Sequence, residues 1–86
     1  MLDMLKIDLG ISGDAYDNRL RQYLETAEQQ IAREGVKLTD SIDDRQLTVA
    51  YAAWLWRRRD NMQGMPRMLR YLLNNRLFAE KMREAD

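Results

Sequence analysis

The 86-residue chain contains neither cysteine nor histidine. Without cysteine it can form neither a disulfide framework nor a thiolate metal site, and without histidine it lacks the usual general base and the commonest neutral metal ligand. It also shows no phosphate-cradling glycine loop and no nucleophile elbow. We therefore predict no enzymatic activity, and no catalytic residue, metal ligand or cofactor is expected.

Long apolar runs are also missing. No stretch approaches the roughly 18 residues that a membrane span needs. The opening MLDMLKIDLG places acidic side chains inside what would have to be the apolar region of a signal peptide. We expect a soluble, intracellular protein with no membrane partner.

Charge is balanced overall but divided unevenly along the chain. Fourteen basic and 14 acidic residues give a net charge of zero. Residues 1–53 hold six Lys or Arg against ten Asp or Glu, and residues 54–86 hold eight against four, so the two parts carry −4 and +4. A dedicated nucleic-acid binder usually has a clear positive charge, whereas complementary parts let copies of one chain attract each other. The distribution favours a protein that assembles.

The apolar pattern predicts an all-α fold in a single domain spanning residues 1–86. Apolar residues recur every three or four positions, and no segment alternates as a strand would. We expect one short helix and three longer ones, at about residues 2–9, 14–34, 42–60 and 66–84. The third is apolar nearly all round, which is typical of a central helix.

The predicted core residues share one face of each of the three longer helices. They are Leu20, Leu24, Ala27, Ile31, Leu47, Tyr51, Leu55, Leu69 and Leu73. On the last helix, Leu72 and Leu77 join the leucine face, while Met68, Asn75, Ala79 and Met82 form another.

Glycine, proline and polar residues mark the helix boundaries. Gly10 and Gly35 are expected to end the first two helices, and Pro66 suits the first turn of the last. Ser12 or Asp14 can cap the second helix.

The acidic residues near position 40 can be explained by the start of the third helix. Asp40 or Ser41 can cap it, and Asp43 and Asp44 lie where the helix dipole favours acids. The spacing lacks the glycine and distal glutamate of a calcium loop, so we prefer capping to metal binding.

Two tryptophans and three arginines end the third helix. Successive residues are about 100° apart, so Arg57, Arg58 and Arg59 fan around the helix and cannot all face one phosphate backbone. A solvated end that complements the helix dipole is the simpler interpretation. Trp54 and Trp56 lie on nearly opposite faces, so one is expected in the core and the other in a second core layer or at a subunit contact.

Methionines and asparagines around the last helix allow two interpretations each. Met62, Met65 and Met68 indicate adaptable packing against another surface or ordinary gap-filling. Asn74 and Asn75 interrupt a leucine-rich helix, where they either fix the register of an interface or face solvent.

Three segments resemble the head–tail connector (head-completion or adaptor) proteins of long-tailed phages and prophages. They are LKIDLGISGDAYDNRLRQYLETAEQQIAREGV, the tyrosine- and alanine-rich LTVAYAAWLWRRRD, and the proline-started MPRMLRYLLNNRLFAEK. Together they cover nearly the whole chain, and the last is the most distinctive.

The resemblance implies a non-enzymatic structural virion protein. Such a subunit would form a ring, about dodecameric like the portal, that docks beneath the portal, joins capsid to tail and helps retain packaged DNA. Its partners would be further copies, the portal protein and other head–tail junction or tail proteins, with DNA meeting it only in the ring channel. It would be located in the host cytoplasm during assembly and then at the head–tail junction of the virion.

A ring also follows from size. A compact domain of this length has a radius of gyration near 12 Å, too small to enclose a duplex, so only several copies could surround DNA. A ring uses heterologous contacts, which complementary charge would suit. We expect acidic positions of the second helix and its flanking loops to meet arginines of the last two helices, such as Arg67 and Arg76, across the subunit boundary.

The residues expected at contacts between copies lie in the C-terminal third of the chain. They are Trp56, Arg58, Met65, Arg67, Arg70, Asn74, Asn75 and Arg76. Arg57 and Arg59 are the candidates to face DNA.

Two other functions fit the sequence. A small DNA-binding regulator or packaging accessory would use residues 66–84 as a recognition helix, with Arg67, Arg70, Asn74 and Arg76 reading base edges. A helical adaptor or antitoxin-like module for an unrelated partner is the third.

Overall fold

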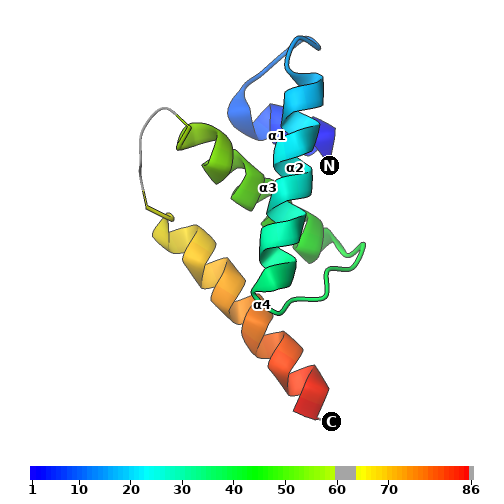
Figure 1. The fold of residues 1–86 in the computed structure, drawn as a ribbon, viewed down its shortest axis with the longest axis vertical. Helices are drawn as coiled ribbons and strands as arrows, with labels where there is room; N and C mark the ends of the chain where they lie inside the picture. Colours follow the sequence, from blue (N-terminus) through cyan, green and yellow to red (C-terminus); the bar gives the residue numbers. More distant parts are fainter. Residues whose placement is uncertain (60–63, 86) are drawn as a thin grey trace.

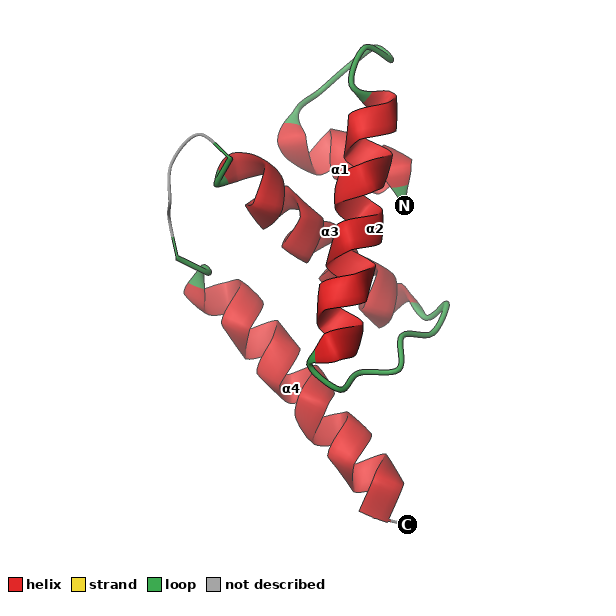
Figure 2. Ribbon diagram, viewed as in Figure 1, coloured by secondary structure: helices red, strands yellow, loops and turns green. Residues whose placement is uncertain are grey.

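The computed structural model describes residues 1–59 and 64–85, which contain four α-helices (Figures 1 and 2). These are α1 (Leu2–Leu9), α2 (Asp17–Arg33), α3 (Ile42–Arg57) and α4 (Arg67–Ala85). The prediction of an all-α fold with one short and three longer helices is confirmed.

Helix α3 lies at the centre of the arrangement. It packs against α2, α1 and α4, and α1 also packs against α2. The C-terminal end of α4 extends beyond the other helices (Figure 1). The molecule measures 46 × 27 × 18 Å, and its radius of gyration of 13.3 Å exceeds the value near 12 Å expected for a compact chain.

Helix α2 starts three residues later than predicted. Neither Ser12 nor Asp14 caps it, because the N-cap is Tyr16 and no side-chain cap is present. Gly13 adopts a φ of 85°, and the amide of Asp17 donates to the carbonyl of Asp14 at 3.2 Å. The segment before the helix is therefore a turn rather than its first coil.

The remaining boundaries lie close to the predicted ones. Ser41 caps α3 by accepting a hydrogen bond from the amide of Asp44 at 3.1 Å. Helix α3 ends at Arg57 instead of residue 60, which lies outside the described residues, as does Met62. Gly10 follows α1 with a φ of 71°, in the left-handed region that glycine enters readily. Pro66 immediately precedes α4.

The core contains the predicted residues and several that the pattern missed. All of the nine predicted positions are buried except Leu55, which is partly buried and packs against the others. The additional buried apolar residues are Leu5, Val36, Val49, Ala52, Ala53 and Trp56. Residues on nearly every side of α3 are buried, as expected of a central helix.

Two adjacent leucines of α4 differ in burial, so their substitutions should differ in their effect on the free energy of unfolding. Leu73 is 2% exposed and Leu72 is 40% exposed. We expect Leu73→Ala to lower the free energy of unfolding by about 3 kcal/mol, because it leaves a cavity, and Leu72→Ala to lower it by under about 1 kcal/mol. Urea denaturation followed by circular dichroism, at one low protein concentration, measures both. Equal losses would contradict the packing described for α4.

Candidate functional site: the two faces of α4

A cluster of buried charges fastens α4 to α3. Arg76 on α4 donates from Nε to Asp44 Oδ1 at 2.7 Å and from Nη1 to Glu80 Oε2 at 2.7 Å. Its Nη2 donates to the backbone carbonyl of Lys37 at 2.8 Å. Asp44 Oδ2 also accepts from the amide and the hydroxyl of Thr39, at 2.8 and 2.9 Å. One guanidinium thus joins α3, α4 and the segment between α2 and α3.

The carboxylates of this cluster are held in their charged forms. Asp44 and Glu80 are each 3% exposed. Burial alone would raise the pKa of Asp44, but hydrogen bonds from Arg76 and Thr39 outweigh it and leave this pKa below its ordinary value. The hydrogen bond from Arg76 likewise lowers the pKa of Glu80, and the hydrogen bond to Asp44 raises the pKa of Arg76.

This cluster corrects the role expected for Arg76. The acidic partners of Arg76 lie in its own chain, not across a subunit boundary as the sequence suggested. The physical reason is that burying Asp44 beside α4 requires a cation, and Arg76 is the residue of α4 that supplies it. Asp44 therefore lies near the start of α3, as predicted, and also forms the buried ion pair that joins α3 to α4.

The opposite face of α4 carries a second row of apolar side chains. We call it the outer stripe, and it comprises Met68, Tyr71, Leu72, Asn75, Phe78, Ala79 and Met82. All are exposed, the five large apolar ones by 40% to 69%. At about 100° per residue, the outer stripe is centred about 140° from the face formed by Leu69, Leu73 and Glu80. Helix α4 is apolar on two sides, and one of them faces solvent.

A groove lies beside the first half of the outer stripe. It has a volume of about 570 Å³ and is bounded by α1, α3 and α4, so we call it the α1/α3/α4 groove. Its lining is largely apolar, with Met4, Ile7, Val49 and Trp54, and it includes Met68 and Leu72 of the outer stripe. Asp8 and Arg57 are the charged residues of the lining. Ile7 is 81% exposed.

The two tryptophans have different surroundings. Trp56 is 9% exposed, and its ring meets the edges of Tyr16 and Tyr23 at centroid distances of 5.5 and 5.7 Å. Trp54 is half-buried, lines the groove and donates from Nε1 to the carbonyl of Gly64 at 3.2 Å. Trp56, expected at a subunit contact, is thus a core residue of the monomer, because α2 brings two tyrosines onto it.

The three arginines after Trp56 fan out as predicted and contact different groups. Arg57 bonds to Asp8 of α1, at 3.2 Å to its carbonyl and 3.4 Å to its carboxylate. The guanidinium of Arg58 lies 4.9 Å from the Trp54 ring centroid, and that of Arg59 lies 3.8 Å from the Trp56 centroid. Each is tied to the chain through an aromatic ring or an acid. Whether Arg57 or Arg59 faces DNA stays a prediction.

The other expected contact residues are mostly at the surface of α4. Arg67, Arg70, Asn74 and Asn75 are exposed, whereas Met65 is half-buried against the core. Asn75 lies in the outer stripe. Arg67, Arg70, Asn74 and Lys81 lie along one side of the stripe, and we call them the basic flank.

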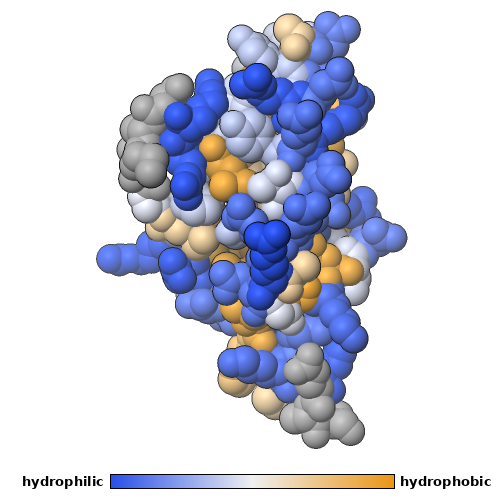
Figure 3. All heavy atoms as spheres, in the orientation of Figure 1, coloured by the Kyte–Doolittle hydropathy of each residue, from blue (hydrophilic) through white to orange (hydrophobic). Residues whose placement is uncertain are grey.

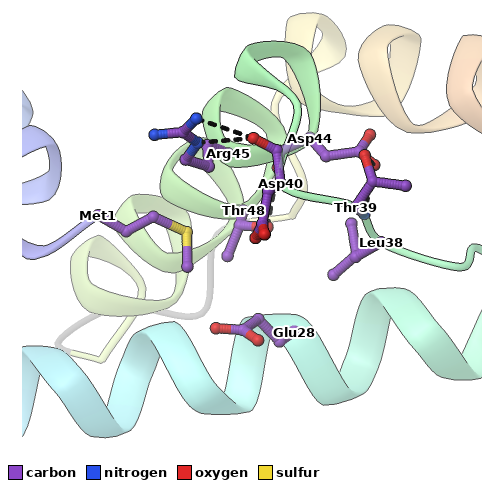
Figure 4. A pocket seen from close by; sticks show the side chains of 8 residues that line it. All are labelled: Met1, Glu28, Leu38, Thr39, Asp40, Asp44, Arg45 and Thr48. Atoms are coloured by element: carbon purple, nitrogen blue, oxygen red, sulfur yellow. Dashed lines mark hydrogen bonds between the residues drawn. The ribbon is translucent and has the colours of Figure 1, made fainter.

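A second, polar pocket of about 600 Å³ lies between α2 and the start of α3 (Figure 4). Its hydrogen bonds are made within the chain: Arg45 donates to the carbonyl of Asp40 at 2.8 and 3.0 Å, and Asp44 accepts from Thr39. In residues 1–59 and 64–85, no group of three acidic side chains is placed to hold a metal ion. No described helix is long and apolar enough to cross a membrane.

Comparisons with protein-family models, with curated proteins and with solved structures found no match. The outer stripe and the groove are therefore interpreted from their own geometry.

Sequence reasoning found part of the outer stripe and missed the rest. It placed Met68, Asn75, Ala79 and Met82 on a second face, wrongly assigned the exposed Leu72 to the leucine face, and did not add Tyr71 and Phe78. The spacing of three and four residues from Met68 to Met82 was a sufficient signal for both. The burial of Arg76 had no such signal, because its partner Asp44 is 32 positions away.

The charge cluster predicts how stability depends on pH. Asp44 and Glu80 have pKa values below their ordinary values of 3.8 and 4.5, so the stability they contribute is present above about pH 4.5 and is lost as pH falls through the folded-state values. The free energy of unfolding should fall between about pH 5 and about pH 2. Asp44→Asn should make this dependence shallower. Urea denaturation across that range measures it.

Asp43→Asn is the matched control, because Asp43 is the exposed neighbour of Asp44 on the same helical turn. It should keep the pH dependence of the unchanged chain. If Asp44→Asn and Asp43→Asn give the same slope, the cluster does not govern acid stability.

Proposed function

We propose that the chain is a subunit of a head–tail connector ring of a long-tailed phage or prophage. In this role it is a structural protein that docks beneath the portal, joins capsid to tail and helps retain packaged DNA. The observation that carries the proposal is the outer stripe of α4, which leaves a row of large apolar side chains in solvent. Contiguous exposed apolar surface of this kind marks a protein interaction site.

Charge placement supports contacts between copies. The exposed acidic residues Asp3, Glu25 and Asp43 lie on α1, α2 and the start of α3. The exposed basic residues Arg67 and Arg70 lie on α4, and the side chain of neither makes a hydrogen bond or an ion pair in the described part of the chain. Exposed acids on α1, α2 and α3 and exposed cations on α4 would allow head-to-side contacts between copies, although α2 also carries the exposed cations Arg19, Arg21 and Arg33.

The dimensions of the subunit also support a ring. With a radius of gyration of 13.3 Å, one copy cannot surround a duplex, whereas a closed ring of copies can. The resemblance of the sequence to head–tail connectors adds the position beneath the portal and a ring of about twelve copies. DNA would then pass through the channel without being read by the protein.

Deletion of the gene from the phage or prophage that encodes the chain tests this function. We expect particles of the unchanged phage to contain the chain, detected by mass spectrometry. The deletion should yield tails separate from heads that have lost their DNA, seen by electron microscopy, and a plasmid copy of the gene should restore joined particles. Normal infectious particles from the deletion would rule the proposal out.

Duplex DNA binding is the second candidate function. It is favoured by the basic flank, which places Arg67, Arg70, Asn74 and Lys81 along one side of α4. Against it, Arg76 is held by Asp44 and Glu80 and cannot read a base edge. The apolar outer stripe beside the flank would also face the groove of the duplex.

We expect the purified chain to show negligible affinity for free duplex DNA at about 150 mM salt, measured by fluorescence anisotropy. Tight binding by a monomer or dimer that weakens steeply with salt would instead favour the regulator, because phosphate contacts release counterions. Arg67→Glu is the suitable variant for that case, since it removes an exposed cation without disturbing the buried cluster.

A further inference from the structure

We propose that the outer stripe of α4 in one copy lies in the α1/α3/α4 groove of a second copy. This inference deepens the proposed function and rests on its premise that copies of the chain assemble. The part of the stripe that would enter the groove is its second half, with Phe78 and Met82, which does not line the groove of its own chain.

The outer stripe has the form of a helix that binds in a groove. Such helices present apolar anchors at spacings of three, four and seven residues. Tyr71, Phe78 and Met82 follow this spacing and are all exposed. The groove offers apolar side chains of α1 and α3, including Ile7, Val49 and Trp54, to receive them.

A single chain cannot fill its own groove with this stripe. The α4 residues that line the groove end at Leu72, near the start of the helix. Phe78 and Met82 lie further along α4, in the half that extends away from the other helices (Figure 1). Figure 3 shows hydrophobic side chains reaching the surface among hydrophilic ones over this region. Met68 and Leu72 of the outer stripe thus line the groove of their own chain, whereas Phe78 and Met82 do not reach it and are left to enter the groove of a second copy.

Charge favours this arrangement over the symmetric pairing of two α4 helices. The outer stripe is symmetric in spacing about Asn75, so two copies of α4 could pair antiparallel. That pairing would bring the two basic flanks together, and like charges on facing sides repel. In the groove lining, in contrast, the cation Arg57 is already paired with Asp8 at 3.4 Å, and the exposed acids Asp3 and Asp43 belong to α1 and α3, two of the helices that bound the groove. In the groove arrangement we expect the basic flank of the incoming α4 to meet Asp3 and Asp43.

Two variants that each disable one surface provide the test. Phe78→Asp charges the stripe and leaves the groove intact, and Ile7→Asp charges the groove and leaves the stripe intact. Analytical ultracentrifugation at about 100 µM should show an oligomer for the unchanged chain and a monomer for each variant, with self-association weakened at least about 100-fold. Mixing the two variants should restore a 1:1 dimer that grows no further, because only one stripe and one groove remain.

Folded controls keep the result decisive. Gln29→Glu adds one negative charge at an exposed position of α2 away from both surfaces and should leave the oligomer intact. Met82→Glu is a second stripe variant that should behave as Phe78→Asp does. Circular dichroism should show unchanged helix content in all four variants.

A monomeric unchanged chain, variants that still assemble, or a mixture that stays monomeric would each overturn the inference. The last result, with both variants folded, would indicate a symmetric contact or another partner. The proposed function stands or fails separately: particles without the chain would remove the function and leave a restored dimer valid. Particles that contain the chain would support the function even if mixing failed.

Discussion

The ion-pair cluster of Asp44, Arg76 and Glu80 determines which side of α4 faces solvent. Leucine contacts such as those of Leu69 and Leu73 hold a helix against its neighbour but tolerate small rotations, whereas a guanidinium with hydrogen bonds to two carboxylates tolerates few. Because these charges are buried, an α4 rotated out of this register would leave at least one of them without a partner. The outer stripe is exposed as a consequence of that register.

The tryptophans of α3 bind two of the arginines at the end of this helix, so these arginines do not form the basic patch that the sequence suggests. Three consecutive cations suggest a basic patch in the sequence, but Arg58 and Arg59 lie over Trp54 and Trp56, and Arg57 is bonded to Asp8. Arg57 thus links the end of α3 to α1, and Arg58 and Arg59 pack on the two tryptophan rings of α3. On α4, the exposed cations Arg67 and Arg70 lie beside an apolar row, and this combination is more typical of a protein contact than of a nucleic-acid contact.

Local features of the fold could be predicted from the sequence, and long-range ones could not. Spacing of apolar residues, Gly10 and Ser41 gave the four helices and most of the core, because periodicity and capping act over a few residues. The side of the core on which Trp56 falls depends on Tyr16 and Tyr23, which belong to a different segment of the chain. The candidate site was predicted in part for the same reason: the outer stripe is periodic, whereas the groove exists only where α1, α3 and α4 meet.

The flattened shape of the chain has a consequence for the proposed ring. The chain is 46 Å long but only 18 Å across its shortest direction, because α4 extends past the other helices instead of folding back over them. If copies stood side by side in such a ring with their shortest direction along its circumference, many of them would fit around a small diameter. The length of α4 would then add to the height of the ring instead of its circumference.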